Sequence, residues 1–224
     1  MADITRREWL GCVAGGAAAV GLAATGVGCT GLKRGSVVHK NAEFYAADKT
    51  FDQEAAKKAY FALMEYHGYP VYDNLRQNMW VADFTVGRFT DVGMGGIFWI
   101  NEKDGAYFGH EIFLLPGQMI PEHWHVKTAE AAPKMEAWQV RYGGVTLFAE
   151  GEASAGAEKV IPASELKFTT CRKMLKVAPG DLGKLDKAEA KHFMVAGPEG
   201  AIVTEYASYH DMAALRFTNP GVKL

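Results

Sequence analysis

From about Asn78 to the C-terminus, the chain is a series of short apolar, β-branched and aromatic segments separated by Gly, Asp and Asn. The clearest of these segments are GGIFWIN, YFGHEIFLLP, AWQVRY, VTLFAEGE, HFMVAG and AIVTEYAS. Segments of this kind favour β-strands, and many short strands separated by turns are typical of a sandwich or a jelly-roll barrel. The sequence therefore predicts a mostly β fold, and 224 residues suffice for one such domain with attachments.

The segment that precedes the strands has a different pattern. TFDQEAAKKAYFALMEYHG predicts an N-terminal helix that Asp52 caps and Gly68 ends, with an apolar stripe of Ala, Tyr, Leu and Met. Residues 31–50 are polar and show no period, so they are interpreted as a linker. The barrel domain, including its N-terminal helix, is accordingly expected to cover residues 51–224.

Residues 1–30 have the layout of an export signal of the twin-arginine type. Arg6 and Arg7 precede Trp9 and a run of Ala, Gly, Val and Leu that is too weakly apolar for a membrane-spanning anchor. The run ends in GVGC, which resembles a lipidation site at Cys29. We expect export by the twin-arginine route to the periplasm, with attachment to the cell envelope only if Cys29 carries a lipid.

The net charge and the cysteine content limit which partners and which cysteine chemistry are expected. The formal net charge of −2 provides no basic field, so a nucleic-acid partner is not expected. Of the three cysteines, two lie in the first thirty residues, so the body holds no disulfide framework. The remaining Cys171 is expected to be an inert, partly buried thiol.

The segment PGQMIPEHWHVK carries two histidines, His123 and His125, separated by one residue. In a β-strand, residues i and i+2 point to the same face, so both imidazoles would project into one space. Two neutral imidazoles that converge in this way form half of a metal site. On the pair alone, a half-exposed strand that carries two histidines is an equally good interpretation.

The wider spacing resembles the first motif of the cupin family, in which two histidines and a glutamate bind one metal ion. Gly117 is followed after five residues by the two histidines, and later Glu136 is followed after six residues by Gly143. A competing glutamate, Glu130, lies in the expanded turn KTAEAAPK, where a solvated carboxylate is expected. Glu136 begins the next predicted strand and is the preferred ligand.

The second cupin motif supplies a third histidine after a Pro–Gly turn, and here Pro179-Gly180 precedes His192 at the start of a predicted strand. The resemblance implies a double-stranded β-helix, the jelly-roll barrel of the cupins. It also implies one divalent metal ion with open positions for substrate. The implied ligands are His123, His125, Glu136 and His192.

A narrower resemblance covers most of the chain after the signal. NMWVADFTVGRFTDVGMGGIFWIN, GQMIPEHWHVKTAE, HFMVAGPEGAIVTEYASYHD and RFTNP are similar to successive segments of the D-lyxose isomerase family of sugar isomerases. The resemblance implies a metal-dependent aldose–ketose isomerase that acts on a small sugar through an enediolate. It implies manganese, although the ligand set would also accept zinc, iron, cobalt or nickel. Dimers are common among such barrels, so a homodimer is expected.

Two residues are predicted to act in this reaction. Glu205, in IVTEYAS, matches the glutamate of the corresponding family segment and would move the proton between adjacent carbons, with burial raising its pKa. Lys127 is the candidate cation that polarises or protonates a substrate oxygen. The alternatives are a strand-edge glutamate that faces water and a solvated turn lysine. The role of His110 stays open.

Two other functions are compatible with the same ligands. A cupin oxygenase would use three histidines and a carboxylate to hold Fe(II), and a non-catalytic sugar-binding cupin would need no proton shuttle. Activity without oxygen separates an isomerase from an oxygenase. Proton transfer by Glu205 and Lys127 separates an enzyme from a binding protein.

Overall fold

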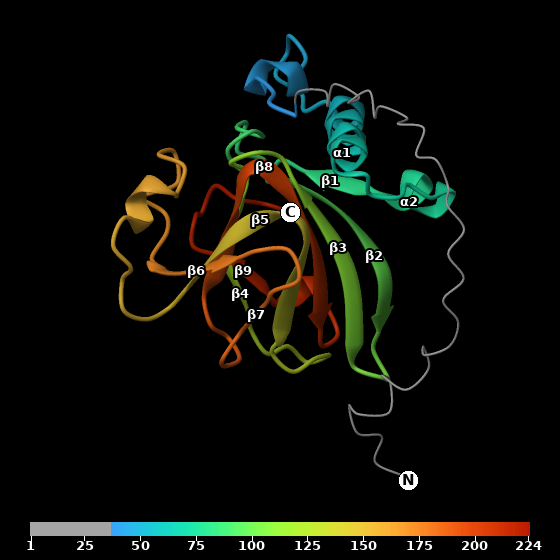
Figure 1. Cartoon of the computed structure of the whole chain (residues 1–224). Coiled ribbons are helices and arrows are strands. Elements are labelled where there is room, and N and C mark those ends of the chain that lie inside the picture. The colour runs from blue at the N-terminus through green and yellow to red at the C-terminus, as the bar shows by residue number, and fades with distance from the viewer. Residues whose placement is uncertain (1–36) are drawn as a thin grey trace, which may run out of the picture. The chain divides into compact units, whose positions relative to one another are not determined.

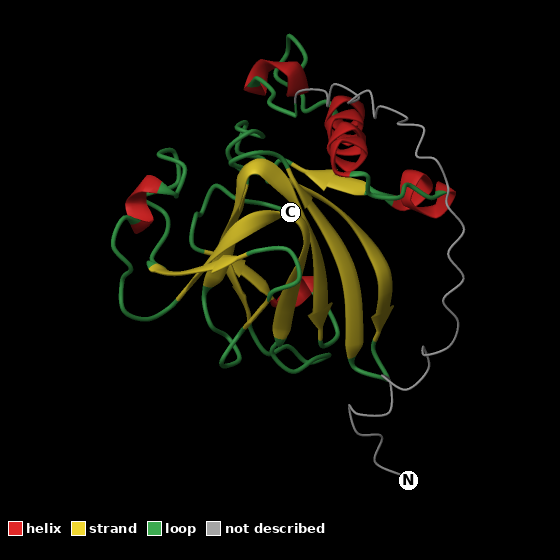
Figure 2. Cartoon of the chain, in the orientation of Figure 1, coloured by secondary structure: helices red, strands yellow, loops and turns green. Residues whose placement is uncertain are grey.

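The computed structural model describes residues 37–224, so the predicted export signal with Arg6, Arg7 and Cys29 lies outside the described residues. The described chain is mostly β, with the helices before the sheet (Figures 1 and 2). The strands are β1 (Trp80–Ala82), β2 (Met94–Glu102), β3 (Tyr107–Leu114), β4 (Met119–His125), β5 (Glu136–Ala149), β6 (Lys173–Val177), β7 (Leu182–Lys184), β8 (His192–Ala207) and β9 (Leu215–Phe217). The helices are α1 (Gln53–His67) and α2 (Asp73–Asn78), with short 3-10 turns η2 (Asn41–Phe44), η3 (Ala157–Lys159) and η4 (Met212–Ala214).

Two long strands, β5 and β8, organise the sheet. They pair antiparallel from Glu136 opposite Ala207 to Ala149 opposite His192. The first part of β8 also pairs with β4 and its last part with β3, while β5 pairs first with β7 and then with β6. Because each long strand contributes to two groups of strands, the antiparallel sheet curls around itself (Figure 1). The prediction of a mostly β barrel is confirmed.

Four of the predicted strands are in fact two. AWQVRY and VTLFAEGE form β5, and HFMVAG and AIVTEYAS form β8. The glycines between them are bends rather than turns. Gly143 and Gly200 both have φ of 70°, and a Cβ on Gly143 would lie 2.1 Å from the Gly200 carbonyl oxygen. The two strands therefore approach each other closely where both bend, which a side chain would prevent.

Helix α1 begins and ends where the sequence predicts. The Asp52 side chain accepts a hydrogen bond from the Ala55 amide, and Gly68 ends the helix in the left-handed conformation. One face is buried against the outer surface of the sheet, where Tyr60 packs on Phe89 and Phe113 with ring centroids 5.8 and 6.5 Å apart. The helix thus closes a second apolar core, separate from the core inside the barrel.

The predicted linker is wrong from residue 37 onward. This part contains η2, and Phe44 is only 1% exposed. The Phe44 ring packs edge-on against the Phe89 ring, with centroids 4.7 Å apart. Tyr45 forms an isolated antiparallel β-bridge with Phe51. A few apolar side chains thus fix a segment whose average composition is polar. Across residues 37–224, no helix combines the length and apolar character that a membrane crossing requires.

Candidate active site

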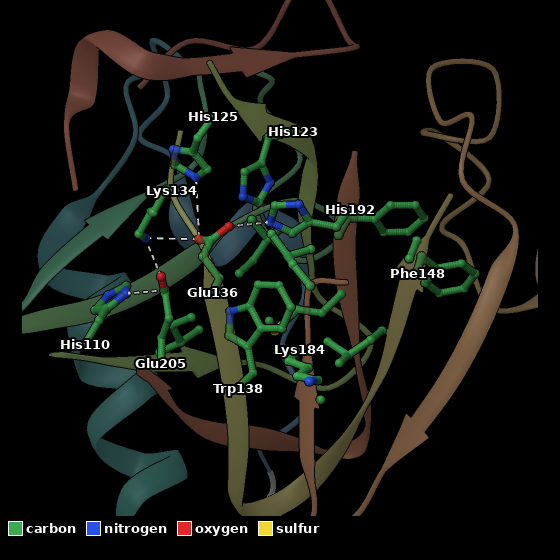
Figure 3. A pocket seen from close by; sticks show the side chains of 18 of the residues that line it. His110, His123, His125, Lys134, Glu136, Trp138, Phe148, Lys184, His192 and Glu205 are labelled. Atoms are coloured by element: carbon green, nitrogen blue, oxygen red, sulfur yellow. Dashed lines mark hydrogen bonds and ion pairs between the residues drawn. The ribbon is translucent and has the colours of Figure 1, made fainter. Parts of the chain in front are cut away.

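A pocket of about 270 Å³ opens into the curled sheet. A group of its polar side chains comes from β3, β4, β5, β8 and the loop before β5, and these side chains point toward one another (Figure 3). The titratable residues at its centre are His110, His123, His125, Lys134, Glu136, His192 and Glu205. All of the proposed metal ligands are among them.

The two histidines of β4 converge as their spacing predicts. His123 and His125 have ring centroids 5.4 Å apart and nearly perpendicular planes. Together with Glu136, the first residue of β5, they offer ligand atoms that all lie within 4.8 Å of one another. His125 Nε2 is 3.5 Å from the Glu136 Oε1 atom.

His192 joins the same cluster from the start of β8. It lies opposite His123 in the strand register, and the two ring centroids are 4.3 Å apart. Its Nε2 is 3.0 Å from Glu136 Oε2, yet both atoms are buried without a hydrogen-bond partner among the described residues. Orphaned buried donors and acceptors are costly, and a shared cation would satisfy both.

Backbone carbonyls fix the tautomers of two ligands. His123 Nδ1 lies 2.8 Å from the Pro121 oxygen, and His192 Nδ1 lies 2.9 Å from the Ala190 oxygen. Because a carbonyl only accepts, each Nδ1 must carry the hydrogen. The Nε2 lone pairs are then free for a metal ion, an arrangement that recurs in metal-bound histidines.

The charge states also suit a divalent cation. Burial and the neighbouring imidazoles hold the pKa of His123 well below its ordinary value, so this ring is neutral. Burial would raise the pKa of Glu136, but Lys134 and His192 outweigh it and hold that pKa well below its usual range. Burial would lower the pKa of His192, but the Glu136 carboxylate raises it. A neutral His123 beside the ionised Glu136 carboxylate fits a mixed N/O metal site, and a bound metal ion would take the place of the proton that Glu136 favours on His192.

Glu205 lies beside this cluster and is 4% exposed. His110, its direct partner across β3 and β8, places Nδ1 3.1 Å from Glu205 Oε2. Burial acts to raise the pKa of Glu205, but Lys134 and His110 outweigh it, so this pKa is lowered. The expected rise is wrong, because the sequence did not reveal the two partners. Glu205 is an ionised, hydrogen-bonded carboxylate, suited to accept a proton.

The buried lysine of the pocket is Lys134, not the predicted Lys127. Lys127 is exposed and absent from the pocket wall, and only its backbone amide contacts Glu189, at 3.2 Å. Lys134 is 3% exposed and donates hydrogen bonds to Glu136, at 3.0 Å, and to Glu205. One buried ammonium therefore links the two buried carboxylates (Figure 3).

Three other titratable residues near the predicted site also have defined surroundings. Glu130 is exposed and pairs with Lys103, so the preference for Glu136 agrees with the geometry. His110, whose role stayed open, contacts Glu205 and stacks on Trp80 at 5.4 Å. His210, in the loop after β8, lines the pocket, and burial lowers its pKa to about 3.

Comparisons with known proteins give curated sugar isomerases among the relatives of this chain. No protein-family model matches the chain. The D-lyxose/D-mannose isomerase of Thermosediminibacter oceani is 31% identical over 170 residues, which cover 76% of this chain and 88% of that protein. The D-lyxose ketol-isomerase of Cohnella laeviribosi is 33% identical over 143 residues, which cover 64% of this chain and 77% of that protein.

Solved structures with the same fold include L-ribose isomerases. The enzyme of Acinetobacter sp. DL28 in complex with L-ribose aligns with a TM-score of 0.57 and 16% identity, covering 75% of this chain and 91% of that chain. The enzyme of Cellulomonas parahominis with L-ribose aligns with a TM-score of 0.58 and 17% identity, covering 75% and 90% of the two chains. The cupin-like barrel predicted from the sequence is thereby confirmed.

Proposed function

The chain belongs to the D-lyxose ketol-isomerase family of aldose–ketose isomerases, and from this premise we propose that it interconverts D-lyxose and D-xylulose, or D-mannose and D-fructose, with one divalent metal ion. The observation that carries the proposal is the cluster in one pocket of three imidazoles and two buried carboxylates joined by a lysine. Manganese is the proposed metal, held by the residues His123, His125, Glu136 and His192.

The bound metal would act as a Lewis acid that holds the carbonyl and hydroxyl oxygens of the sugar and stabilises the charge that develops on them. Glu205 supplies the proton chemistry. Its lowered pKa keeps the carboxylate ionised near neutral pH, so it can take a proton from one substrate carbon and return it to the neighbouring carbon. His110 donates to Glu205 Oε2 and thereby orients the carboxylate.

Lys134 takes the role proposed from the sequence for Lys127. Its ammonium contacts both Glu136 and Glu205, so it keeps the proton shuttle ionised, and in the proposed reaction it would polarise or protonate a substrate oxygen. It also lies 4.3 Å from the centroid of the Phe108 ring, which covers it from the apolar side of the pocket. A cation held in this way needs no rearrangement when charge develops on the substrate.

The test is turnover of a sugar panel by purified protein that has been stripped of metal and reloaded with Mn²⁺. Aldopentoses, aldohexoses and their ketoses are incubated without oxygen, and products are identified by chromatography. We expect an aldose–ketose pair that appears with Mn²⁺ and disappears with a chelator. Turnover that requires oxygen would support the Fe(II) oxygenase instead. Binding of a sugar without turnover would support the non-catalytic cupin.

We also propose that the protein works after export by the twin-arginine route, since Arg6 and Arg7 precede a weakly apolar run. Replacing both arginines by lysine should retain the protein in the cytoplasm, as measured by cell fractionation. Unchanged export of this variant would contradict the proposal. Attachment to the envelope is proposed only for a form lipidated at Cys29, and a homodimer is the proposed assembly.

A further inference from the structure

His210 is a pocket residue that the proposed reaction does not use. It follows β8 in the loop before η4, and its backbone is held from both sides by one side chain. Asn101 Nδ2 donates to the His210 carbonyl oxygen at 3.0 Å, and the His210 amide donates to Asn101 Oδ1 at 3.0 Å. The loop is therefore tied to the end of β2, and the ring is fixed relative to the barrel.

Aromatic contacts hold the ring itself against the pocket wall. It stacks on Phe108 with centroids 5.3 Å apart and an interplanar angle of 23°, and it contacts Phe98 at 5.4 Å. Phe108 is the same ring that covers the Lys134 ammonium. On another side, the His210 ring contacts the His125 ring, with centroids 5.6 Å apart. The imidazole thus borders the space between the proposed metal ligands and the proposed proton shuttle.

One nitrogen of this ring lacks a partner. Nε2 lies 3.0 Å from the Met212 Sδ atom, a weak acceptor that cannot donate, so Nε2 carries the hydrogen. Nδ1 is then a lone-pair acceptor, and it is buried without a hydrogen bond to any described residue. An unsatisfied buried acceptor is costly, and in a pocket wall a ligand hydroxyl can remove that cost.

We propose that His210 is a specificity-determining residue whose Nδ1 accepts a hydrogen bond from one sugar hydroxyl away from the two reacting carbons. This inference rests on the proposed function, because it assumes that a sugar occupies this pocket. A site built to bind a hydroxyl strongly rejects an analogue that lacks it, since the protein acceptor is then left unpaired. His210 therefore selects among sugars that share the same reacting end.

The experiment measures each His210 variant with D-lyxose and with deoxy analogues of D-lyxose. The amide of asparagine reaches the position of Nδ1 and that of glutamine reaches the position of Nε2. We therefore expect His210→Ala and His210→Gln to lower kcat/KM for D-lyxose by roughly ten- to a hundred-fold, and His210→Asn to restore most of it. The contacted hydroxyl is on the third, fourth or fifth carbon of D-lyxose. With the deoxy analogue that lacks it, wild type and His210→Ala should have equal kcat/KM. His67→Ala, at the end of α1, is the matched control.

Three results would overturn the proposal. An equal loss on D-lyxose and on every deoxy analogue, together with weaker Mn²⁺ binding, would mean that His210 orients His125 instead. Equal calorimetric affinity of wild type and His210→Ala for D-lyxose would exclude the contact even if neither protein turns the sugar over. Failure of turnover alone refutes the proposed isomerase, whereas a hydroxyl-dependent affinity difference would still support the His210 contact. Absence of any sugar binding by the wild type would overturn both.

Discussion

Replacing Lys134 by methionine tests the centre of the proposed site most directly. Lys134, Glu136 and Glu205 are 3%, 5% and 4% exposed, and the ammonium is the group that joins both carboxylates. Methionine keeps much of the volume of the side chain but removes the charge and the donors. Two ionised carboxylates would then be buried without their cation. Removal of one partner from a buried ion pair costs about 3–5 kcal/mol.

That cost is a large part of the stability of a domain, which is about 5–15 kcal/mol in total. For a domain of this size, each kcal/mol lowers Tm by about 2–4 °C, so we expect a fall of about 6–20 °C. Thermal unfolding followed by circular dichroism, with a chelator present so that no metal neutralises Glu136, measures the effect. The double variant Lys134→Met/Glu205→Gln should recover part of the loss, because one of the unpaired charges is gone.

The control is the same substitution at the lysine first predicted from the sequence. Lys127 is exposed and makes no side-chain ion pair among the described residues, so Lys127→Met should change the free energy of unfolding by less than about 0.5 kcal/mol. Isomerisation should be lost only in the Lys134 variant. If the two variants had equal stability and equal activity, the assignment of Lys134 as the central cation would be refuted.

Three further predictions follow from the buried carboxylates. Glu205→Gln should keep the fold and the metal but lose about a hundred- to ten-thousand-fold in rate; wild-type turnover would exclude the shuttle. Elemental analysis should show metal loss in Glu136→Gln and retention in Glu130→Gln, and the reverse would exchange their roles. Glu111 contacts Thr204 and Tyr69, and burial raises its pKa. Glu111→Gln should therefore be more stable than wild type above that raised pKa, by about 1.4 kcal/mol per pKa unit. This advantage should vanish in denaturant titrations as pH falls below the unfolded value of about 4.5, and its persistence in acid would contradict the reasoning.

The convergence of His123 and His125 was predictable from the alternation of a strand. His192 was predictable from the resemblance of its Pro–Gly turn and strand to the second cupin motif. Glu205 was predictable from the resemblance of its segment to the family. Its partner His110 was not, because the contact depends on the pairing of β3 with β8, whose register no local pattern reveals.

Lys134 was missed because its burial is produced by distant parts of the chain. It ends a segment that looks like an exposed turn. That segment is fixed by hydrogen bonds to residues about eighty positions away, from Thr128 to Asp211 and from the Met135 amide to Ser208. Composition identifies the turn as polar, but only the tertiary contacts show that one of its cations faces inward.

The two merged strands explain how the proposed metal ligands can meet in one cluster. Glu136 and His192 lie at opposite ends of the paired length of β5 and β8, thirteen residues apart along β5 from Glu136 to Ala149, the partner of His192. If both strands were straight, these positions would be separated by roughly 40 Å. Glu136 Oε2 is nevertheless 3.0 Å from His192 Nε2. The strands must therefore fold back on themselves, and the close approach of Gly143 and Gly200 lies at the point where they bend. The glycines that suggested a turn between separate strands are thus required to bring the Glu136 carboxylate to the histidines.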